Sequence, residues 1–107
     1  MSITLHDREG DPICEVEEAT FGKAVERCVS EHVSLSYASL PEVELCATYL
    51  TGADLSRAYL YGADLSHAHI TGADLSGANL VDANLTDADL ADANLAGADL
   101  TGANLTG

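Results

Sequence analysis

Basic residues are scarce in this sequence. Four Lys and Arg stand against eighteen Asp and Glu, which gives a formal net charge of −14, and no basic residue follows Arg57. Phosphate contacts need clustered Lys and Arg, so the composition argues against direct binding of nucleic acid. The simplest role for the charge is solubility, because a net charge far from zero keeps protein molecules apart. A sharper alternative is an acidic surface that competes with DNA for a DNA-binding protein.

Long apolar runs and targeting segments are also missing. No run approaches the roughly 18 residues that a membrane helix needs, and residues 1–7 lack the basic start and apolar centre of a signal peptide. Cys14, Cys28 and Cys46 form no Cys-x-x-Cys pair, and their odd number favours reduced thiols over a disulfide framework. We therefore expect a cytoplasmic protein without a membrane partner.

Motifs for catalysis and cofactor binding are absent as well. There is no Walker pattern and no Rossmann fingerprint, because the glycines recur at regular positions of a repeat instead of opening a helix. His67 and His69 each precede an aspartate by twenty residues, but they lack the three or four convergent ligands typical of a metal site. The sequence therefore predicts a protein that is not an enzyme and holds no cofactor or metal.

The sequence is organised around a short repeat. Ala-Asp/Asn-Leu recurs every five residues over much of the region from Ala53 to Leu105, and looser copies such as Val33-Ser34-Leu35 keep the same register. A period of five fits neither the 3.6-residue helix nor the two-residue strand. The chain must therefore turn a corner in each repeat, and a fixed short period of this kind indicates a solenoid.

This pattern resembles that of the pentapeptide-repeat family, A(D/N)LXX, in which the central Leu and the preceding Ala point inward. The resemblance covers residues 33–107 and implies an all-β fold. That fold is a right-handed quadrilateral parallel β-helix with twenty residues per coil, or about four coils here. Residues twenty apart then stack about 4.8 Å apart, and a side chain larger than Ala would overpack the interior.

Residues 1–32 are predicted to form an N-terminal cap. Alternating residues at 2–7 and 13–16, around turn residues at 8–11, predict a β-hairpin. Thr20 is placed to cap an amphipathic helix, whose apolar face consists of Phe21, Ala24, Val25, Cys28 and Val29. We expect this face to cover the open top of the first coil. The chain is thus divided into a cap, 1–32, and a β-helix, 33–107.

Unusual outward side chains gather in the first two coils. The twenty-residue register stacks Tyr37 on Arg57, as in a cation–π contact, and Tyr49 on His69. Scattered surface residues with incidental pairing would explain these positions without any function. The alternative is a patch that contacts another protein, formed by Tyr37, Tyr49, Arg57, Tyr59, Tyr61, His67 and His69.

The C-terminal coil is expected to be open. Nothing after Leu105 resembles the apolar helix that covers the first coil, and an open sheet edge favours pairing with another chain. The commonest closed solution is a two-fold homodimer, here through Leu90, Leu95, Leu100 and Leu105.

Two functions stay open at this point. The first is an acidic β-helical module for protein interaction or structure, whose partner the sequence does not name. The resemblance implies the second, because some pentapeptide-repeat proteins are DNA mimics that bind DNA gyrase, a topoisomerase, and modulate its inhibition. Fewer than four coils of about 4.8 Å each correspond to only about five or six base pairs. We therefore favour the interaction module.

Overall fold

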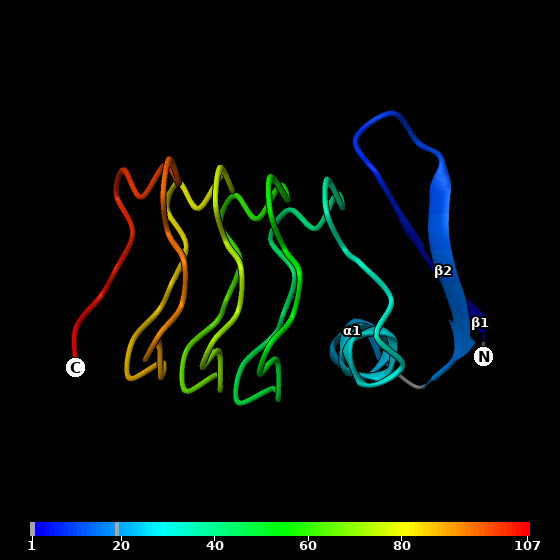
Figure 1. The fold of residues 1–107 in the computed structure, drawn as a ribbon, viewed down its shortest axis with the longest axis horizontal. Coiled ribbons are helices and arrows are strands. Elements are labelled where there is room, and N and C mark those ends of the chain that lie inside the picture. Colours follow the sequence, from blue (N-terminus) through cyan, green and yellow to red (C-terminus); the bar gives the residue numbers. More distant parts are fainter. Residues whose placement is uncertain (1, 19) are drawn as a thin grey trace.

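The structure is a computed structural model that describes residues 2–18 and 20–107. An antiparallel hairpin and one helix precede a stack of coils (Figure 1). The hairpin consists of β1 (Ser2–His6) and β2 (Pro12–Glu17), with Ile3 opposite Val16 and an irregularity after Leu5. The expected hairpin is therefore present, and its second strand is longer by one residue at each end than the alternation indicated.

The helix α1 (Phe21–Ser30) begins where the sequence predicts. The hydroxyl of Thr20 accepts a hydrogen bond from the Lys23 N–H at 3.1 Å, which satisfies one of the free donors of the first turn. Ala24, Val25 and Cys28 are fully buried in the core. The expectation is wrong for Phe21, which is 47% exposed. It is the first residue of the helix and borders an open groove at the margin of the first coil.

A disulfide joins β2 to α1. It links Cys14 to Cys28, whose Cα atoms are 6.9 Å apart, while Cys46 keeps a free thiol. The expectation of three reduced thiols is therefore wrong for two of them, because packing of the helix against the hairpin brings these cysteines together. Disulfides persist mainly in oxidising compartments. The cysteines therefore no longer support a cytoplasmic location, which stays a prediction.

The rest of the chain is a repeat β-helix. Parallel bridges join residues twenty apart, beginning with Ser39 and Tyr59 and ending with Asn84 and Asn104. Two turn residues recur every five residues, so each coil changes direction at regular intervals. The backbone hydrogen bonds run between coils, as from Leu55 N–H to the carbonyl of Asp74 at 2.8 Å. Figure 1 shows the coils stacked side by side from the cap to the C-terminus.

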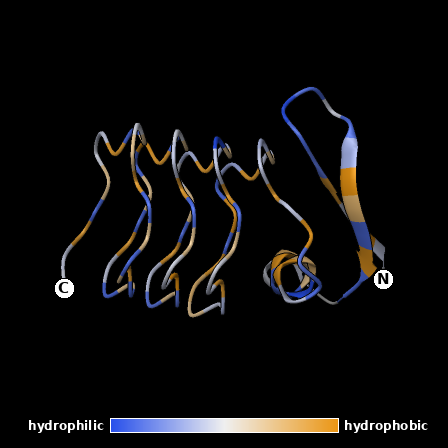
Figure 2. Cartoon of the chain, in the orientation of Figure 1, coloured by the Kyte–Doolittle hydropathy of each residue, from blue (hydrophilic) through white to orange (hydrophobic). Residues whose placement is uncertain are grey.

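The core is a column of leucines and alanines inside the coils. Apolar and polar residues alternate along each coil (Figure 2), and every repeat leucine or isoleucine from Leu35 to Leu85 is buried. The column continues into the cap through Leu5 and Val25. It thins at the other end, where Leu105 is 51% exposed. The core is therefore most complete in the middle coils.

The cap also satisfies backbone groups of the first coil. The carbonyl of His6 accepts a hydrogen bond from Ser39 N–H at 2.7 Å. On another side of the coil, the Glu26 carboxylate of α1 accepts from Tyr49 N–H at 2.7 Å. Hairpin and helix therefore provide acceptors that a preceding coil would otherwise supply.

Shortening a core leucine tests the column. Leu75 is fully buried and Leu105 is half exposed. Leu75→Ala should lower the free energy of unfolding by about 2 to 5 kcal/mol, the usual cost of a large-to-small core change. Leu105→Ala removes the same atoms from a site already in water and should cost clearly less. Urea melts measure both, and equal losses would contradict a core that thins toward the C-terminus.

Candidate functional site

Every fifth residue of the coils has a left-handed backbone. The φ angle is positive at each of these corner positions from His32 to Gly107. Glycine and aspartate fill most of them and tolerate this conformation best. The other six corners have His32, Tyr37 (φ 65°), Glu42, Ala47, Arg57 (φ 57°) and His67 (φ 59°). A residue with a Cβ in this conformation costs roughly 1 to 2 kcal/mol, so the fold itself does not favour these side chains.

The residue between Ala and Leu has a structural task of its own. In Asp54 and Asp64, for example, Oδ1 accepts the N–H of the residue two positions later, at 3.1 and 3.0 Å, and also that residue's hydroxyl. Asn84 accepts the same two bonds from Thr86. This is the Asx turn, in which a side chain replaces a backbone acceptor. Sequence reasoning missed this role, although the interchange of Asp and Asn, often followed by Ser or Thr, was the available signal.

Six of the seven residues predicted for the patch stand at a left-handed corner or at the Asx position, where most repeats have Gly, Asp or Asn. Tyr37, Arg57 and His67 stand at left-handed corners. Tyr49, Tyr59 and His69 stand at the Asx position and accept no turn hydrogen bond there. Only Tyr61 lies at a position that the repeat leaves variable. Histidine, like aspartate, is enriched in the left-handed region, and Ala47 also stands at a corner without offering a polar or aromatic side chain. Among the corners, Tyr37 and Arg57 are therefore the departures that best fit residues retained for function.

Tyr37 and Arg57 form the contact that the register predicts. The Arg57 guanidinium carbon lies 5.8 Å from the centroid of the Tyr37 ring, within the range of a cation–π interaction. Gly77 lies one coil further, and a Cβ there would come within 3.0 Å of the Arg57 Cγ. The glycine thus leaves room for the arginine side chain at this corner.

Tyr59 and Tyr61 extend the same corner along the next side of the coil. Their rings stack with centroids 6.3 Å apart. The Arg8 guanidinium, from the hairpin turn, lies 5.4 Å from the Tyr59 ring centroid. We call Tyr37, Arg57, Tyr59 and Tyr61 the tyrosine surface. It combines aromatic rings with positive charge on an otherwise acidic protein.

The other three predicted residues lie elsewhere on the coils. Tyr49 stacks on His69 with ring centroids 4.7 Å apart, on the side opposite Tyr59 in the twenty-residue register. His67 stands at a further corner, with its Nδ1 3.8 Å from the Asp87 carboxylate. The seven residues thus form three groups around the coil, and only the tyrosine surface brings four of them together.

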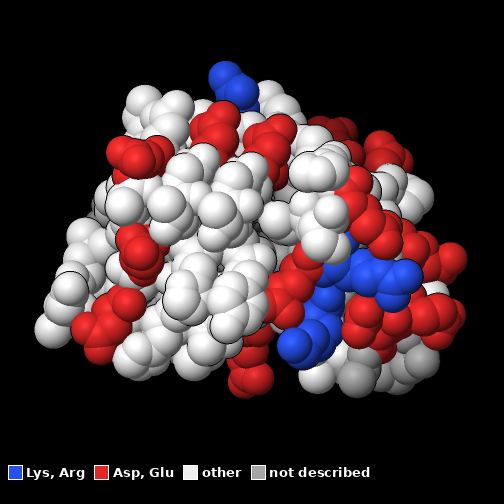
Figure 3. Space-filling model, turned by 60° about the horizontal axis from the view of Figure 1, so that its bottom comes forward, with Lys and Arg blue, Asp and Glu red and all other residues white. Residues whose placement is uncertain are grey.

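The charge is distributed unevenly. Three of the four basic residues belong to the cap, namely Arg8, Lys23 and Arg27. Acidic side chains spread over the visible face, whereas the basic ones gather mainly at the cap end (Figure 3). Arg27 bonds to Glu31 and Glu18, and these hydrogen bonds raise the pKa of its guanidinium. The coils are therefore an acidic surface interrupted by Arg57.

Hydrogen bonds also tune one carboxylate at the cap end of the coils. The Ser34 hydroxyl donates to Asp54 Oδ2 at 2.6 Å, one coil away. This bond is the main reason that the pKa of Asp54 is lowered below its ordinary value of 3.8; burial opposes the shift, and Ser56 adds to it. Bonds from Thr101 likewise lower the pKa of Asp99. These bonds hold the outward carboxylates in their charged form.

Metal-binding and membrane-spanning features can be assessed over residues 2–18 and 20–107. Within them, no three His, Cys, Asp or Glu side chains converge in a group suited to a metal ion. No helix in the same residues is long and apolar enough to cross a membrane.

The stacked coils and the regular turns define a repeat β-helix. The family model described as pentapeptide repeats matches residues 31–66 and 68–107, with eight copies. The chain belongs to the pentapeptide-repeat family. In the comparison with curated proteins, no significantly similar protein is found.

Two solved structures are similar in both sequence and fold. A pentapeptide repeat protein from Nostoc Pcc 7120 shares 38% identity with a TM-score of 0.68, over 78% of this chain and 74% of that one. A pentapeptide repeat protein from the Arabidopsis thaliana thylakoid lumen shares 34% identity with a TM-score of 0.55. That alignment covers 69% of this chain and 59% of the plant protein, so it spans less than two thirds of the latter.

Removing the Ser34 hydroxyl tests the link between the hydrogen bond and the charge of Asp54. Because the folded pKa is lowered, this stabilisation is present above the ordinary value of 3.8 and is lost as pH falls through the folded pKa. Ser34→Ala should therefore raise the pKa of Asp54, measured by carboxyl NMR. It should destabilise the fold more at neutral pH than in acid.

Ser30→Ala is the control, because its hydroxyl donates to the Arg27 carbonyl and not to a carboxylate. The same loss of stability at both pH values in Ser34→Ala would show that the hydrogen bond does not favour the charged form.

Proposed function

We propose that this chain is a non-enzymatic protein-interaction module that binds its partner through the tyrosine surface. The observation that carries the proposal is the presence of Tyr37 and Arg57 at left-handed corners. Tyr37 and Arg57 gain a cation–π contact of about 0.5 to 1 kcal/mol, but this is less than the cost of about 1 to 2 kcal/mol for each left-handed corner, where glycine would be free of strain. Their presence is best explained by an interaction outside the chain.

The interior of the coils supports binding in preference to catalysis. Leucine and alanine fill it, so the fold has no central cavity in which a substrate could be enclosed. Proteins of this family are generally structural repeat proteins. We further propose that the coils are right-handed and four-sided as the family resemblance implies, which presents the tyrosine surface on a rigid frame.

The chemistry of the tyrosine surface suits a protein partner. Tyrosine and arginine are enriched among the residues that dominate binding energy at protein interfaces. Tyr37 is half exposed, and Tyr61 is exposed as well. Both rings are already stacked or paired, so little side-chain freedom remains to be lost on binding.

Replacing the corner residues by glycine tests this proposal. Tyr37→Gly with Arg57→Gly should keep or raise the stability of the fold, because relief of about 1 to 2 kcal/mol per corner exceeds a cation–π contact of about 0.5 to 1 kcal/mol. In affinity capture from a bacterial lysate, a partner bound by the wild type should be lost from this variant. Urea melts establish that the variant remains folded.

Tyr49→Asn with His69→Asn is the matched control. It changes the same kinds of residue on the opposite side of the coil. A partner retained by the control and lost from the corner variant supports the tyrosine surface. A partner that all three proteins capture equally would contradict it.

A second candidate function is mimicry of DNA toward a topoisomerase such as DNA gyrase. One observation favours it: Asn84 makes the same turn hydrogen bonds as Asp64, so the fold does not require the charge at these positions. The charge of the five aspartates at this position, Asp54, Asp64, Asp74, Asp89 and Asp99, is thus free to serve another purpose. In the same capture experiment, recovery of a topoisomerase at low salt and not at high salt would favour this candidate.

We also propose that the C-terminal coil pairs with a second copy of the chain. Leu90, Leu95 and Leu100 are only partly buried, and Leu105 is half exposed. Asp82, Asp87 and other carboxylates of both copies would crowd near such a junction. Salt screens charges beyond about 8 to 10 Å, so light scattering should show a dimer that strengthens as ionic strength rises. A monomer at every salt and high protein concentration would contradict the pairing.

A further inference from the structure

The cap leaves one side of the first coil without a backbone partner. In later coils the amide at this position always donates to the coil before it: Asp64 N–H bonds to the Val43 carbonyl at 2.9 Å, and Asn84 N–H to the Ala63 carbonyl at 2.9 Å. The equivalent amide of the first coil belongs to Glu44. It makes no hydrogen bond with any residue that the structure describes, and neither do the carbonyls of Glu44 and Cys46.

These free groups have the pattern of an open strand edge. In the later coils the carbonyls of Asp64 and Ser66 accept bonds from Leu45 and Ala47 of the coil before. The Glu44 carbonyl faces Gly22 of α1, where a Cβ would come within 3.1 Å of it, so the open part of the edge is the Glu44 N–H donor and the Cys46 carbonyl acceptor. An extended peptide could pair with these two groups, as in the addition of a strand to a sheet.

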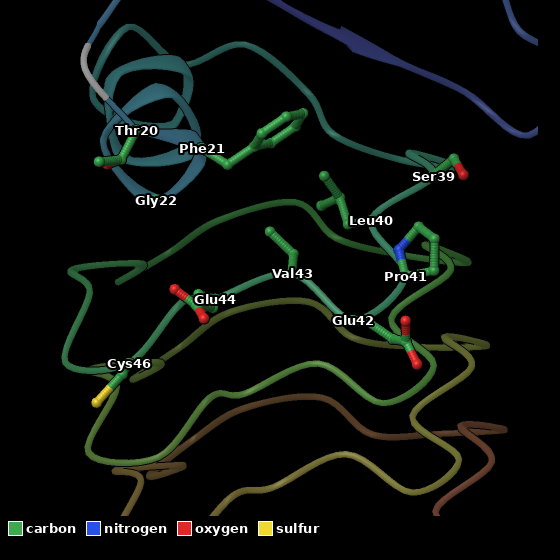
Figure 4. Close-up of a pocket in the computed structure, with 10 residues that line it drawn as sticks. All are labelled: Thr20, Phe21, Gly22, Ser39, Leu40, Pro41, Glu42, Val43, Glu44 and Cys46. Atoms are coloured by element: carbon green, nitrogen blue, oxygen red, sulfur yellow. The ribbon is translucent and has the colours of Figure 1, made fainter.

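A groove runs between this edge and the start of α1. It has a volume of about 600 Å³ and is lined by residues of both elements. Figure 4 shows Phe21 reaching into the space above Leu40 and Val43. The last two are nearly buried and form the floor, whereas Phe21 is 47% exposed and forms a wall. The groove thus offers an apolar space beside the free edge.

The rim of the groove is acidic. Glu42 and Glu44 line it, both are exposed, and neither forms an ion pair with a described residue. Glu42 also stands at a left-handed corner, with φ 54°, where the next two coils have glycine or aspartate. Its charge is therefore placed at a cost to the local backbone, as at the tyrosine surface.

We propose that this groove binds an extended segment of a partner protein that carries one bulky apolar side chain between Lys or Arg residues. The segment's backbone pairs with the edge at 44–46, its apolar side chain packs against Phe21 and Val43, and its basic residues face Glu42 and Glu44. A second copy of this chain is disfavoured, because it carries a net charge of −14. The groove adjoins the tyrosine surface, because the amides of Leu40 and Glu42 donate to the carbonyls of Tyr59 and Tyr61. Its lining residues are different, so each surface can be tested with its own variants.

A synthetic peptide, Lys-Arg-Val-Phe-Val-Lys-Arg, provides the probe. In NMR titrations of the whole chain, we expect it to shift the Glu44 amide and slow that amide's hydrogen exchange. A peptide with Glu in place of the Lys and Arg should not bind. Replacing both Val by Pro removes backbone donors and should weaken binding about tenfold, because the edge then loses hydrogen bonds.

Two variants with matched controls locate the site. Glu42→Lys with Glu44→Lys should weaken binding at least about tenfold, because like charges then oppose the peptide. Glu9→Lys with Glu15→Lys makes the same change of net charge on the hairpin and should weaken it much less. Phe21→Ala should also weaken binding, whereas Leu105→Ala, at the far end of the coils, should not.

Several results would overturn the proposal. They are absence of peptide binding to the folded wild type, equal binding of the acidic peptide, and an unchanged Glu44 amide at saturation. Equal weakening by the rim and hairpin charge reversals would reduce the effect to net charge and would overturn it as well. None of these outcomes bears on the tyrosine surface, whose variants leave the groove intact.

Discussion

The hydrogen bonds between coils, made at a spacing of twenty residues, are the constraint on which the whole structure depends. They place Leu55 over Leu75 and Asp54 over Asp74. The interior then takes leucine or isoleucine at one position and a small residue at the other, mostly alanine but Val43 and Thr48 in the first coil, and each corner requires a left-handed residue. Core, corners and outward columns are consequences of one register. Stability is therefore nearly a sum of coil and neighbour contributions, as in other solenoids.

This regularity makes departures from the repeat informative. Where the chain needs only to turn, it uses glycine or aspartate at the corner and Asp or Asn before the leucine. His32, Tyr37, Glu42, Ala47, Arg57 and His67 depart from the first pattern, and residues that depart from the second include Tyr49, Tyr59 and His69. These departures concentrate in the first two coils, next to the cap. All of them except Ala47 have a charged, aromatic or imidazole side chain that a partner protein could bind.

The acidic side chains contribute in two ways, as hydrogen-bond acceptors in the turns and as negative charge on the surface. Carboxylates such as Asp54 work as turn acceptors, and hydrogen bonds keep them charged. Asn84 shows that a neutral amide performs the same structural task. The charge is therefore additional to what the fold requires. It is a surface property that can act over distance in steering a basic partner toward the coils.

The repeat in the sequence determined most of the coil structure. Packing between segments that are far apart in the sequence determined how the cap lies on the first coil. A period of five with an unbroken leucine register predicts a solenoid, and the resemblance to the pentapeptide-repeat family adds the count of twenty residues per coil. Together they predict the stacking of Tyr37 on Arg57 and of Tyr49 on His69. The hairpin and the Thr20 cap follow from alternation and local hydrogen bonding. The pairing of Cys14 with Cys28, the exposure of Phe21 and the free edge at Glu44 do not, because they depend on how the cap lies on the first coil. That placement results from contacts between segments far apart in sequence, and no repeat encodes it.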